Sequence, residues 1–405
     1  MGNSASALPY SIDAQVGAPH DHNGWALHEG KATGSASSGA GAASAYSKAG
    51  TKVSVFVGKK PALAKTPVSP RYPNKFQLLP AYHHYQNCRK LRHPHILQVL
   101  ATLDTDNPTS ASTEGGGGGG GNAATSAGPD AVPIDSKKAT GDLIVVTEPC
   151  MSLGEWLLSK PTNDELAWGL ESIVRGLHFL HNDAKLVHGN ISPTSFYVTT
   201  SGDVKLWNFS LITTIDPAIG PSRHFQEWDS IVTPDAYRSP ERIQSNYNLI
   251  AQISGSTTGP SSSVHGMDSY GLGILMDYYW NGSIPQPLQK ATQRLQTPNL
   301  KMRPRLMPLL KCPIFDTTLQ KIQLQLNEIL VQPVEQKVQT WQNLFSSLQN
   351  RTLSKSVAVY KVLPLIQNSI LTICNNESMI SQDFYRREGM FRFVFASFSF
   401  WCFCV

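Results

Sequence analysis

Short apolar runs in the first 150 residues of the chain predict a β-sheet. Residues 53–57 form one run of strand length, and residues 143–147 form a continuous apolar run that ends at Glu148. We expect both to be strands of a sheet. Two further short strands are expected, at 186–187 and at 204–206.

Helical spacing dominates the pattern after these runs. Between residues 165 and 182, leucine, isoleucine and valine recur every three or four positions, as on one face of a helix. Thr162, Asn163 and Asp164 precede this run and can cap its N-terminus. A largely apolar helix is expected at 269–280. Because strands come first and helices dominate later, the fold class is predicted to be α+β.

From Phe315 onward the pattern is helical throughout. Segments near 319–330, 335–348 and 356–374 are separated by proline or polar turns, as in stacked pairs of helices.

Three polar stretches interrupt the chain, and each predicts an inserted loop. They cover residues 34–49, about 104–138, and 254–263. The second contains seven consecutive glycines, Gly115 to Gly121, and we expect disorder there because ordering it would bury almost no apolar surface. No Gly-Lys-Ser/Thr follows the glycines and no strand leads into them, so a phosphate-binding loop is not expected.

Composition and charge exclude several classes of protein. Charged residues make up 16% of the 405, and the net charge is +5, which gives no strong field for nucleic acid. The six cysteines are scattered without a CxxC pair, so we expect neither a zinc site nor a disulfide framework. No signal peptide and no apolar run of 18 residues occurs in the sequence. We expect a soluble, cytoplasmic protein without a metal site and without a nucleic-acid partner.

A series of short motifs, each weak by itself, occurs in the order found in protein kinases. The order of the motifs over more than 200 residues makes the signal specific. The chain therefore resembles a protein kinase domain. The motifs are Leu91–Ile96, Val145–Glu148, His188–Asn190, Lys205–Ser210, Ser239–Glu241, Asp268–Gly273 and Met302–Pro304.

Further segments resemble the SCY-like family of pseudokinases, also called N-terminal kinase-like proteins. These segments are Ala7–Ile12, Trp25–His28, Val53–Val57 and Lys361–Pro364. The resemblance implies a bilobal kinase-like domain over residues 8–312, with inserts near 34–49 and 104–138. It also implies the start of an all-α segment of HEAT-type helical repeats over 313–392, which is apparently truncated.

The resemblance also implies a function in binding. Family members act as scaffolds or adaptors in vesicle traffic between Golgi, endoplasmic reticulum and endosomes. The expected partners are therefore coat or tethering proteins, and the expected location is cytoplasmic and peripheral at Golgi or endosomal membranes.

The residues that carry phosphoryl transfer in a kinase are replaced at the matching positions. A kinase needs a lysine, its glutamate partner, an aspartate base, and an asparagine and second aspartate that bind Mg²⁺. With a phenylalanine, a histidine, two asparagines and a serine in their places, we expect no catalysis and weak or no ATP binding, without a cofactor. The replaced positions are Phe56, His84, Asn190, Ser195 and Asn208.

Other matching positions keep the residue types that hold a kinase fold together. The resemblance implies that His188 bonds to backbone near the next motif, that Glu241 and Arg303 form a buried ion pair, and that Asp268 ties down the catalytic loop. A residual nucleotide pocket would lie near Val55, Thr147 and Glu148. The glycine loop is not encoded, because Gly17 and Gly24 are seven residues apart.

Two other functions stay open at this point. The chain could be an atypical kinase that uses Lys59 or Lys60 together with Asn208, although the plainer interpretation of both lysines is that they are exposed. It could also be an assembly platform outside vesicle traffic.

The two ends of the chain carry separate expectations. Residues 1–7 fit the myristoylation pattern, with Gly2 as the acceptor and Ser6 as the hydroxyl residue, or are a plain N-terminal segment. Residues 393–405 form a Phe-rich tail, too short to span a bilayer as a helix. We interpret the tail as an atypical chain end, with a membrane-interface segment as the alternative.

Overall fold

A computed structural model describes the chain from residue 8 to residue 367 with gaps, in two compact units. The first unit comprises residues 1–160, 172–199 and 204–312, and the second comprises 161–171, 200–203 and 313–405. The described residues are 8–16, 24–34, 46, 48–65, 78–106, 112–113, 140–254, 265–328, 332–333, 336, 339–340, 343, 358–364 and 366–367.

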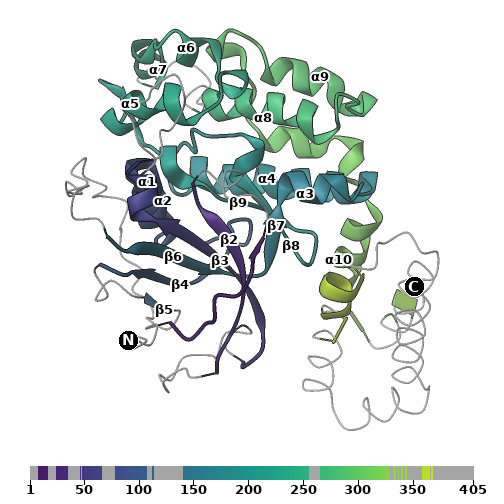
Figure 1. Cartoon of the computed structure of the whole chain (residues 1–405). Helices are drawn as coiled ribbons and strands as arrows, with labels where there is room; N and C mark the ends of the chain where they lie inside the picture. Colours follow the sequence, from purple (N-terminus) through teal and green to yellow (C-terminus); the bar gives the residue numbers. More distant parts are fainter. Residues whose placement is uncertain are drawn as a thin grey trace, which may run out of the picture. The chain divides into compact units, whose positions relative to one another are not determined.

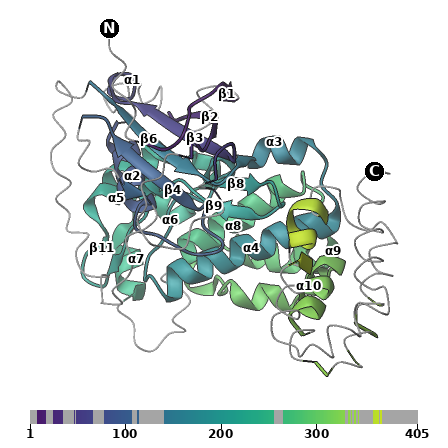
Figure 2. The ribbon, with the colours of Figure 1, turned by 90° about the horizontal axis from the view of Figure 1, so that it is seen from below.

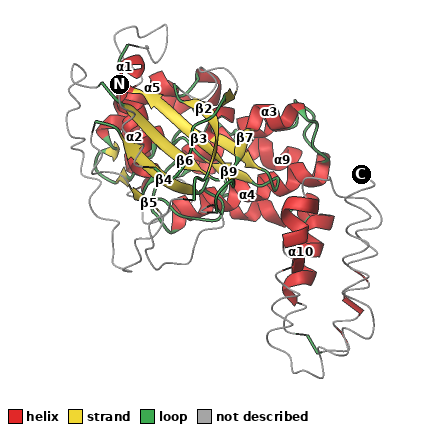
Figure 3. Ribbon diagram, turned by 60° about the horizontal axis from the view of Figure 1, so that its bottom comes forward, coloured by secondary structure: helices red, strands yellow, loops and turns green. Residues whose placement is uncertain are grey.

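The N-terminal part of the first unit is a six-stranded sheet in the order β1-β2-β3-β6-β4-β5. Figure 3 shows its strands side by side as yellow arrows. The strands predicted at 53–57 and 143–147 are confirmed as β3 and β6, which pair antiparallel with Phe56 opposite Val145. The strands are β1 (Gln15–Val16), β2 (Ala26–Lys31), β3 (Lys52–Lys59), β4 (Val99–Asp104), β5 (Ser112–Thr113) and β6 (Asp142–Thr147).

Strand β3 presents its two faces to different surroundings. Val53, Val55 and Val57 belong to a hydrophobic cluster with residues of β4 and β6. Because successive side chains of a strand point to opposite faces, Ser54 and Phe56 face the other side of the sheet. On that second side Phe56 contacts the rings of Tyr197 and Trp207.

The C-terminal part of the first unit is mainly helical. The helices predicted at 165–182 and 269–280 are confirmed as α4 and α8, and α8 packs beside α9 (Figures 1 and 2). The helices named in the first unit, with α4 extending into the second, are α1 (Lys60–Leu63), α2 (Leu78–Cys88), α3 (Leu153–Leu158), α4 (Asn163–Asn182), α5 (Arg223–Val232), α6 (Pro240–Ile243), α7 (Tyr247–Ser254), α8 (Gly266–Tyr279) and α9 (Gln286–Leu295).

Two small sheets complete this part. Strands β7 (Cys150–Ser152), β8 (Phe196–Thr199) and β9 (Val204–Leu206) form one, which confirms the strand predicted at 204–206. Strands β10 (Ile215–Asp216) and β11 (Gly220–Pro221) form the other. The strand predicted at 186–187 is wrong, because Val187 makes only an isolated bridge to Thr213.

The second unit contains the start of α4 and the helix α10 (Thr318–Glu328). At the start of α4, the Thr162 hydroxyl accepts a hydrogen bond from the Glu165 backbone N–H, and Glu165 accepts one from Thr162 N–H at 2.8 Å. This reciprocal capping fixes where α4 begins. The Gln320 amide donates to Glu171.

Helix α10 agrees with the first of the three helical segments expected after Phe315. The segment at 335–348 and most of that at 356–374 lie outside the described residues, apart from a π-helical turn over Ala358–Val362. The HEAT-type pairing of these segments therefore stays a prediction.

The expected inserts fall mostly outside the described residues. The second insert, however, begins later than expected at about 104. Asp104 is the last residue of β4 and is buried, and Ser112–Thr113 form strand β5 against β4. Asp104 pairs with Lys60 at the end of β3, which stabilises this end of β4.

Candidate functional site

The position of the kinase lysine holds Phe56, which is fully buried in an aromatic cluster. Its ring centroid lies 5.0 Å from that of Tyr197 in β8 and 4.7 Å from that of Trp207, which follows β9. Tyr197 and Trp207 are also buried. Aromatic pairs at these distances are favourable contacts. Three rings therefore pack together where a kinase directs an ammonium group at phosphate.

Backbone donors beside the cluster are already paired. The Cys150 N–H donates to the Ser54 hydroxyl at 3.0 Å, and the Glu148 N–H donates to the Gln98 carbonyl at 3.1 Å. The Glu148 carboxylate accepts from Lys205 Nζ at 2.7 Å. Residues 147–150 join the two parts of the first unit, and the backbone N–H groups of Glu148 and Cys150 in this segment are already hydrogen-bonded.

Two of the residues expected near a residual nucleotide pocket have other roles. Val55 packs in the hydrophobic cluster on the other face of β3 from Phe56, and the residual pocket expected near it stays a prediction. The residue that shares the cleft face with Phe56 is Ser54, because a strand alternates its faces. The Thr147 hydroxyl is buried and donates to the Glu148 carbonyl at 3.0 Å.

His84, at the position of the kinase glutamate, is a buried neutral side chain in helix α2. Its Nδ1 accepts a hydrogen bond from the Phe209 N–H at 3.0 Å, and its ring lies against Trp207 with centroids 4.4 Å apart. Burial, with smaller contributions from His83 and His188, lowers the pKa of His84 to about 3. Neither His84 nor Phe56 carries a charge, so the ion pair that a kinase forms between these two positions is absent.

The catalytic loop is held by His188, as the resemblance implies. Its Nε2 bonds to the Trp207 carbonyl at 2.9 Å, and its Nδ1 accepts from the Asn190 N–H at 3.3 Å. The neighbouring Gly189 has φ +75°, and a Cβ there would lie 2.6 Å from Phe225. Only glycine fits both the backbone conformation and the space.

Asp268 at the start of α8 ties the same loop to the helical part. Its carboxylate accepts from the backbone N–H of His188 at 2.7 Å and of Gly189 at 2.9 Å, and it bonds to His181 Nε2 at 2.9 Å. Burial alone would raise the pKa of Asp268, but the bond and charge of His181 and the backbone donors outweigh it and hold the pKa at about 2. Asp268 therefore stays ionised as a structural anion.

Asn190 stands at the position of the kinase base and is 1% exposed. Its Oδ1 accepts from the Ser192 hydroxyl at 3.3 Å, and its Nδ2 has no hydrogen-bond partner among the described residues. Ser195, at the position of the metal-binding asparagine, is fully buried, and its hydroxyl lies 3.5 Å from that of Ser192. Neither a neutral amide nor a serine hydroxyl is a base at neutral pH.

Asn208 stands at the position of the second kinase aspartate and adopts the left-handed conformation, with φ +57°. Its Oδ1 accepts from the Ser210 hydroxyl at 2.8 Å. Its Nδ2 is buried and, within the described part of the chain, unpaired. The structure thus brings Asn190 and Asn208 to the two ends of the His188–Trp207 hydrogen bond.

Buried ion pairs hold the helical part in place. Arg303 donates to both oxygens of Glu241, at 2.7 and 2.8 Å, which is the pair implied by the resemblance. Burial would raise the pKa of Glu241, but Arg303 lowers it. A second pair, which the sequence did not reveal, joins Arg242 Nε to Asp229 at 3.0 Å, and Arg242 also donates to the Gly189 carbonyl at 2.6 Å.

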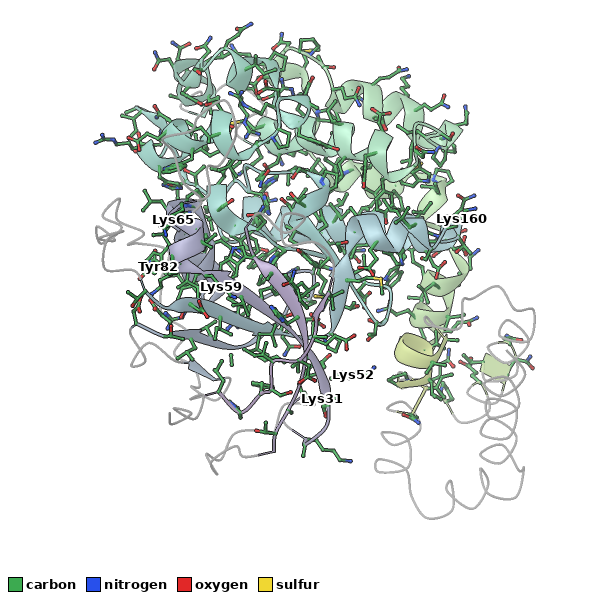
Figure 4. All side chains as sticks on the ribbon, in the orientation of Figure 1. Lys31, Lys52, Lys59, Lys65, Tyr82 and Lys160 are labelled. Atoms are coloured by element: carbon green, nitrogen blue, oxygen red, sulfur yellow. The ribbon has the colours of Figure 1, made fainter. Side chains whose placement is uncertain are left out.

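The two lysines at the end of β3 differ from the expectation that both are exposed. Lys59 is exposed, and Figure 4 shows it at the opposite end of β3 from Lys52. Lys60 is 4% exposed and pairs with Asp104 and with Asp106, the latter at 2.8 Å. It begins helix α1 rather than continuing the strand, so its side chain reaches the end of β4 and not the cleft.

As a whole, the cleft contains packing and hydrogen-bonding groups in place of charged catalytic groups. In the described part of the chain, no group of three or more His, Cys, Asp or Glu side chains could hold a metal ion. Among those residues, none of the helices has the length and apolar character needed to cross a bilayer. Gly2, most of the Gly17–Gly24 segment and the tail from 393 lie outside the described residues.

The sequence did not reveal that Tyr197 contacts Phe56, that Ser54 holds the Cys150 N–H, or that Lys60 forms a buried ion pair outside the site. Tyr197 lies two residues after Ser195, and its parity in β8 could have placed it next to the cleft. The role of Lys60 could not be assigned, because its partners lie 44 and 46 residues away, at the end of β4 and just after it.

Comparison with known proteins identifies SCY1-like relatives, one of which is named a probable inactive kinase. The chain is 28% identical over 245 residues to "Probable inactive serine/threonine-protein kinase scy1" of Dictyostelium discoideum, covering 57% of this chain and 28% of that protein. It is 30% identical over 123 residues to "SCY1-like protein 2" of Homo sapiens, covering 30% of this chain and 12% of that protein. The chain thus spans less than a third of the length of either relative.

The other comparisons concern the fold. No family model matches the chain. Among solved structures, the crystal structure of Cex1p is similar over 96% of this chain and 61% of that one, with a TM-score of 0.54 and 17% identity. Together with the kinase relatives, the α/β arrangement of the first unit supports a bilobal kinase-like fold.

Proposed function

From the confirmed resemblance of this chain to the SCY-like pseudokinases, we propose that the protein is a kinase-like binding module that performs no phosphoryl transfer. Its function would be that of a scaffold or adaptor in vesicle traffic at Golgi, endoplasmic reticulum or endosomal membranes. The relative named a probable inactive kinase supports the loss of catalysis.

The observation that carries this proposal is the burial of Phe56 between Tyr197 and Trp207. The ring replaces the cation, and its two neighbours occupy the space beneath β3 on the cleft side. General-base loss alone typically reduces a rate by about 10²- to 10⁴-fold, and here the electrostatic groups are missing as well. We propose that the function requires neither a nucleotide nor a metal ion.

Labelled ATP provides the test of the catalytic half of the proposal. Incubation of the full chain with ATP, Mg²⁺ or Mn²⁺, and generic protein substrates should give no incorporation above buffer. In parallel, millimolar ATP with Mg²⁺ should leave Tm unchanged, whereas ligand at 100 times its Kd would raise Tm by several degrees. Incorporation that disappears in Asn190→Ala would contradict the proposal.

The trafficking half rests on the resemblance, which also supports coat or tethering proteins as partners. Capture with the full-length protein and identification of the bound proteins should return such partners. If Gly2 is myristoylated, a single acyl chain would hold the protein only weakly, with an association constant of about 10⁴ M⁻¹. Gly2→Ala should then release the membrane-bound fraction into the soluble pool. Capture of proteins that never visit these membranes would favour the assembly platform instead.

The burial of Lys60 counts against the atypical kinase. Its ammonium group is paired with two carboxylates at the end of β4, so using it for phosphate would leave buried Asp104 without that partner. Lys59 is the remaining cation, and it lies at the exposed end of the strand.

A further inference from the structure

Residues 278–315 of the helical part contain six Lys and Arg residues and no Asp or Glu. One of the six, Arg303, is buried and pairs with Glu241. The other five are exposed, and within the described residues none of them forms an ion pair. Unpaired cations gathered on one stretch of chain favour an anionic partner. The five are Lys290, Arg294, Lys301, Arg305 and Lys311.

One segment with two of these cations, residues 300–305, is held against the start of helix α8. Its Arg303 donates to the Gly266 carbonyl at 3.0 Å, and its Pro304 carbonyl accepts from the Ser269 hydroxyl at 3.4 Å. The backbone of the segment is therefore anchored by groups that point inward, while the cations on either side of Arg303 stay at the surface.

A third exposed cation, Lys185, follows α4 and lies near the same end of α8. His265, which precedes α8, stacks on His181 of α4 with ring centroids 4.1 Å apart. Burial and then His181 lower the pKa of His265 to about 3, and Asp268 opposes them. The charges of Lys185 and Arg305 lower the same pKa further, so both side chains lie near this ring.

An exposed apolar side chain lies among these cations. Met302 follows Lys301 and is 64% exposed. The boundary of a lipid bilayer suits this combination, because anionic headgroups attract the cations and the acyl region takes up the apolar side chain. A lone myristoyl chain holds a protein only weakly, and a cationic surface is the kind of second contact that stable anchoring requires.

The nearby carboxylates leave a net positive charge on this surface. Asp268 is buried and bonded to two backbone N–H groups, and Glu241 is buried and held by Arg303. Asp183, two residues before Lys185, is exposed and offsets part of the positive charge. One exposed carboxylate therefore stands against three exposed cations.

We propose that Lys185, Lys301, Met302 and Arg305 form a docking surface for a membrane that contains anionic lipids. Each Lys or Arg near such a membrane strengthens binding by about fivefold. The proposal rests on the membrane location in the proposed function. The two fail separately, because vesicle binding needs no protein partner and partner capture needs no lipid.

Sedimentation of the full chain with vesicles tests the docking surface. Phosphatidylcholine vesicles are compared with vesicles in which about a third of the lipid is phosphatidylserine. Binding should require phosphatidylserine. It should fall as salt rises from about 0.1 M to about 1 M, because the Debye length shortens from about 10 Å to about 3 Å. The Gly2→Ala chain should show the same dependence, which excludes an acyl chain as its cause.

Variants of the docking surface should change the affinity for the anionic vesicles in both directions. Lys301→Gln and Arg305→Gln should each weaken binding by about fivefold, and the triple variant with Lys185→Gln by about 100-fold. Met302→Ser should weaken it by about tenfold without changing its salt dependence. Asp183→Asn removes the offsetting charge and should strengthen binding.

Lys52→Gln is the matched control. Lys52 is exposed and lies opposite Lys31 at the end of the sheet that is far from α8 (Figures 1 and 4). The substitution removes the same charge at a distance where salt screens it, so binding should not change. A loss equal to that in Lys301→Gln would mean that net charge, and not this surface, determines binding.

Other outcomes would also overturn the assignment. Absence of binding to the anionic vesicles at low salt would exclude a membrane as the partner, and equal binding to both kinds of vesicle would exclude selection by charge. Tighter binding of polyglutamate than of the vesicles would mean that the surface takes an acidic protein segment. If the triple variant fails to fold, the single variants and Asp183→Asn decide the question.

Discussion

The first unit contains two regions that differ in what they retain of a kinase. One is the cleft at Phe56, Asn190 and Asn208, and the other is the set of buried charged residues in the helical part. Among the buried charged residues, Glu241, Asp268 and Arg303 keep the residue types and the contacts that the kinase pattern requires. In the cleft, aromatic rings and amides stand at the charged positions. The difference shows that holding the fold and transferring phosphate depend on separate sets of residues.

The largest effect should come from breaking the buried ion pair between Glu241 and Arg303. Glu241→Ala leaves Arg303 buried without its bidentate partner, and removal of one member of a buried pair typically costs about 3–5 kcal/mol. Denaturant unfolding should show this loss. Glu227→Ala removes an exposed partner of Arg223 and should cost about 0–1 kcal/mol. Equal losses in the two variants would mean that the buried pair has no special role.

The free energy of unfolding should fall at acidic pH because His84 is neutral in the folded chain. The pKa of His84 is about 3, below its ordinary value of 6.5, so the unfolded chain takes up a proton at a higher pH than the folded one. The contribution of His84 to the free energy of unfolding is therefore fully present above pH 6.5 and is lost as the pH falls toward 3. His84 should contribute about 1.4 kcal/mol per pH unit to this loss, or roughly 2–3 kcal/mol between pH 6 and 4.

Unfolding free energies measured across this range provide the check. His84→Gln should flatten the slope by one proton relative to the unmodified chain. An unchanged slope in His84→Gln would show that His84 is not held neutral.

Opening the aromatic cluster should have a smaller effect. Phe56→Leu keeps an apolar side chain but loses the ring contacts to Tyr197 and Trp207, for a cost of about 1–3 kcal/mol. The nucleotide response should stay absent, because Ser54 still holds the Cys150 N–H. A rise of several degrees in Tm with ATP and Mg²⁺ would show instead that the rings alone exclude the nucleotide.

The smallest effect is expected at the last remaining candidate cation. Lys59→Ala changes an exposed side chain at the end of β3 and should alter the free energy of unfolding by no more than about 0.5 kcal/mol. The ATP response in the thermal assay should also be unchanged. A loss of nucleotide binding or of phosphate incorporation in this variant alone would favour the atypical kinase.

The sequence by itself determined the elements and the missing chemistry. The periodicity placed β3, β6, α4 and α8, since apolar alternation and helical spacing are local properties of the chain. The order of the motifs predicted the kinase-like fold and the resemblance, both supported by the comparisons. The loss of the catalytic residue types follows from the identities at Phe56, Asn190 and Asn208 alone.

Only the tertiary structure decided what replaced that chemistry. The strand predicted at 186–187 was wrong, because Val187 makes only an isolated bridge to Thr213. Val55 and Phe56 face opposite sides of β3, because one residue of register decides the face to which a side chain points. The pairing of Lys60 with Asp104 and the packing of Phe56 on Trp207 join residues far apart in the sequence. The unpaired nitrogens of Asn190 and Asn208 follow from which atom each serine hydroxyl contacts. Such contacts depend on distances across the fold, which local sequence patterns do not specify.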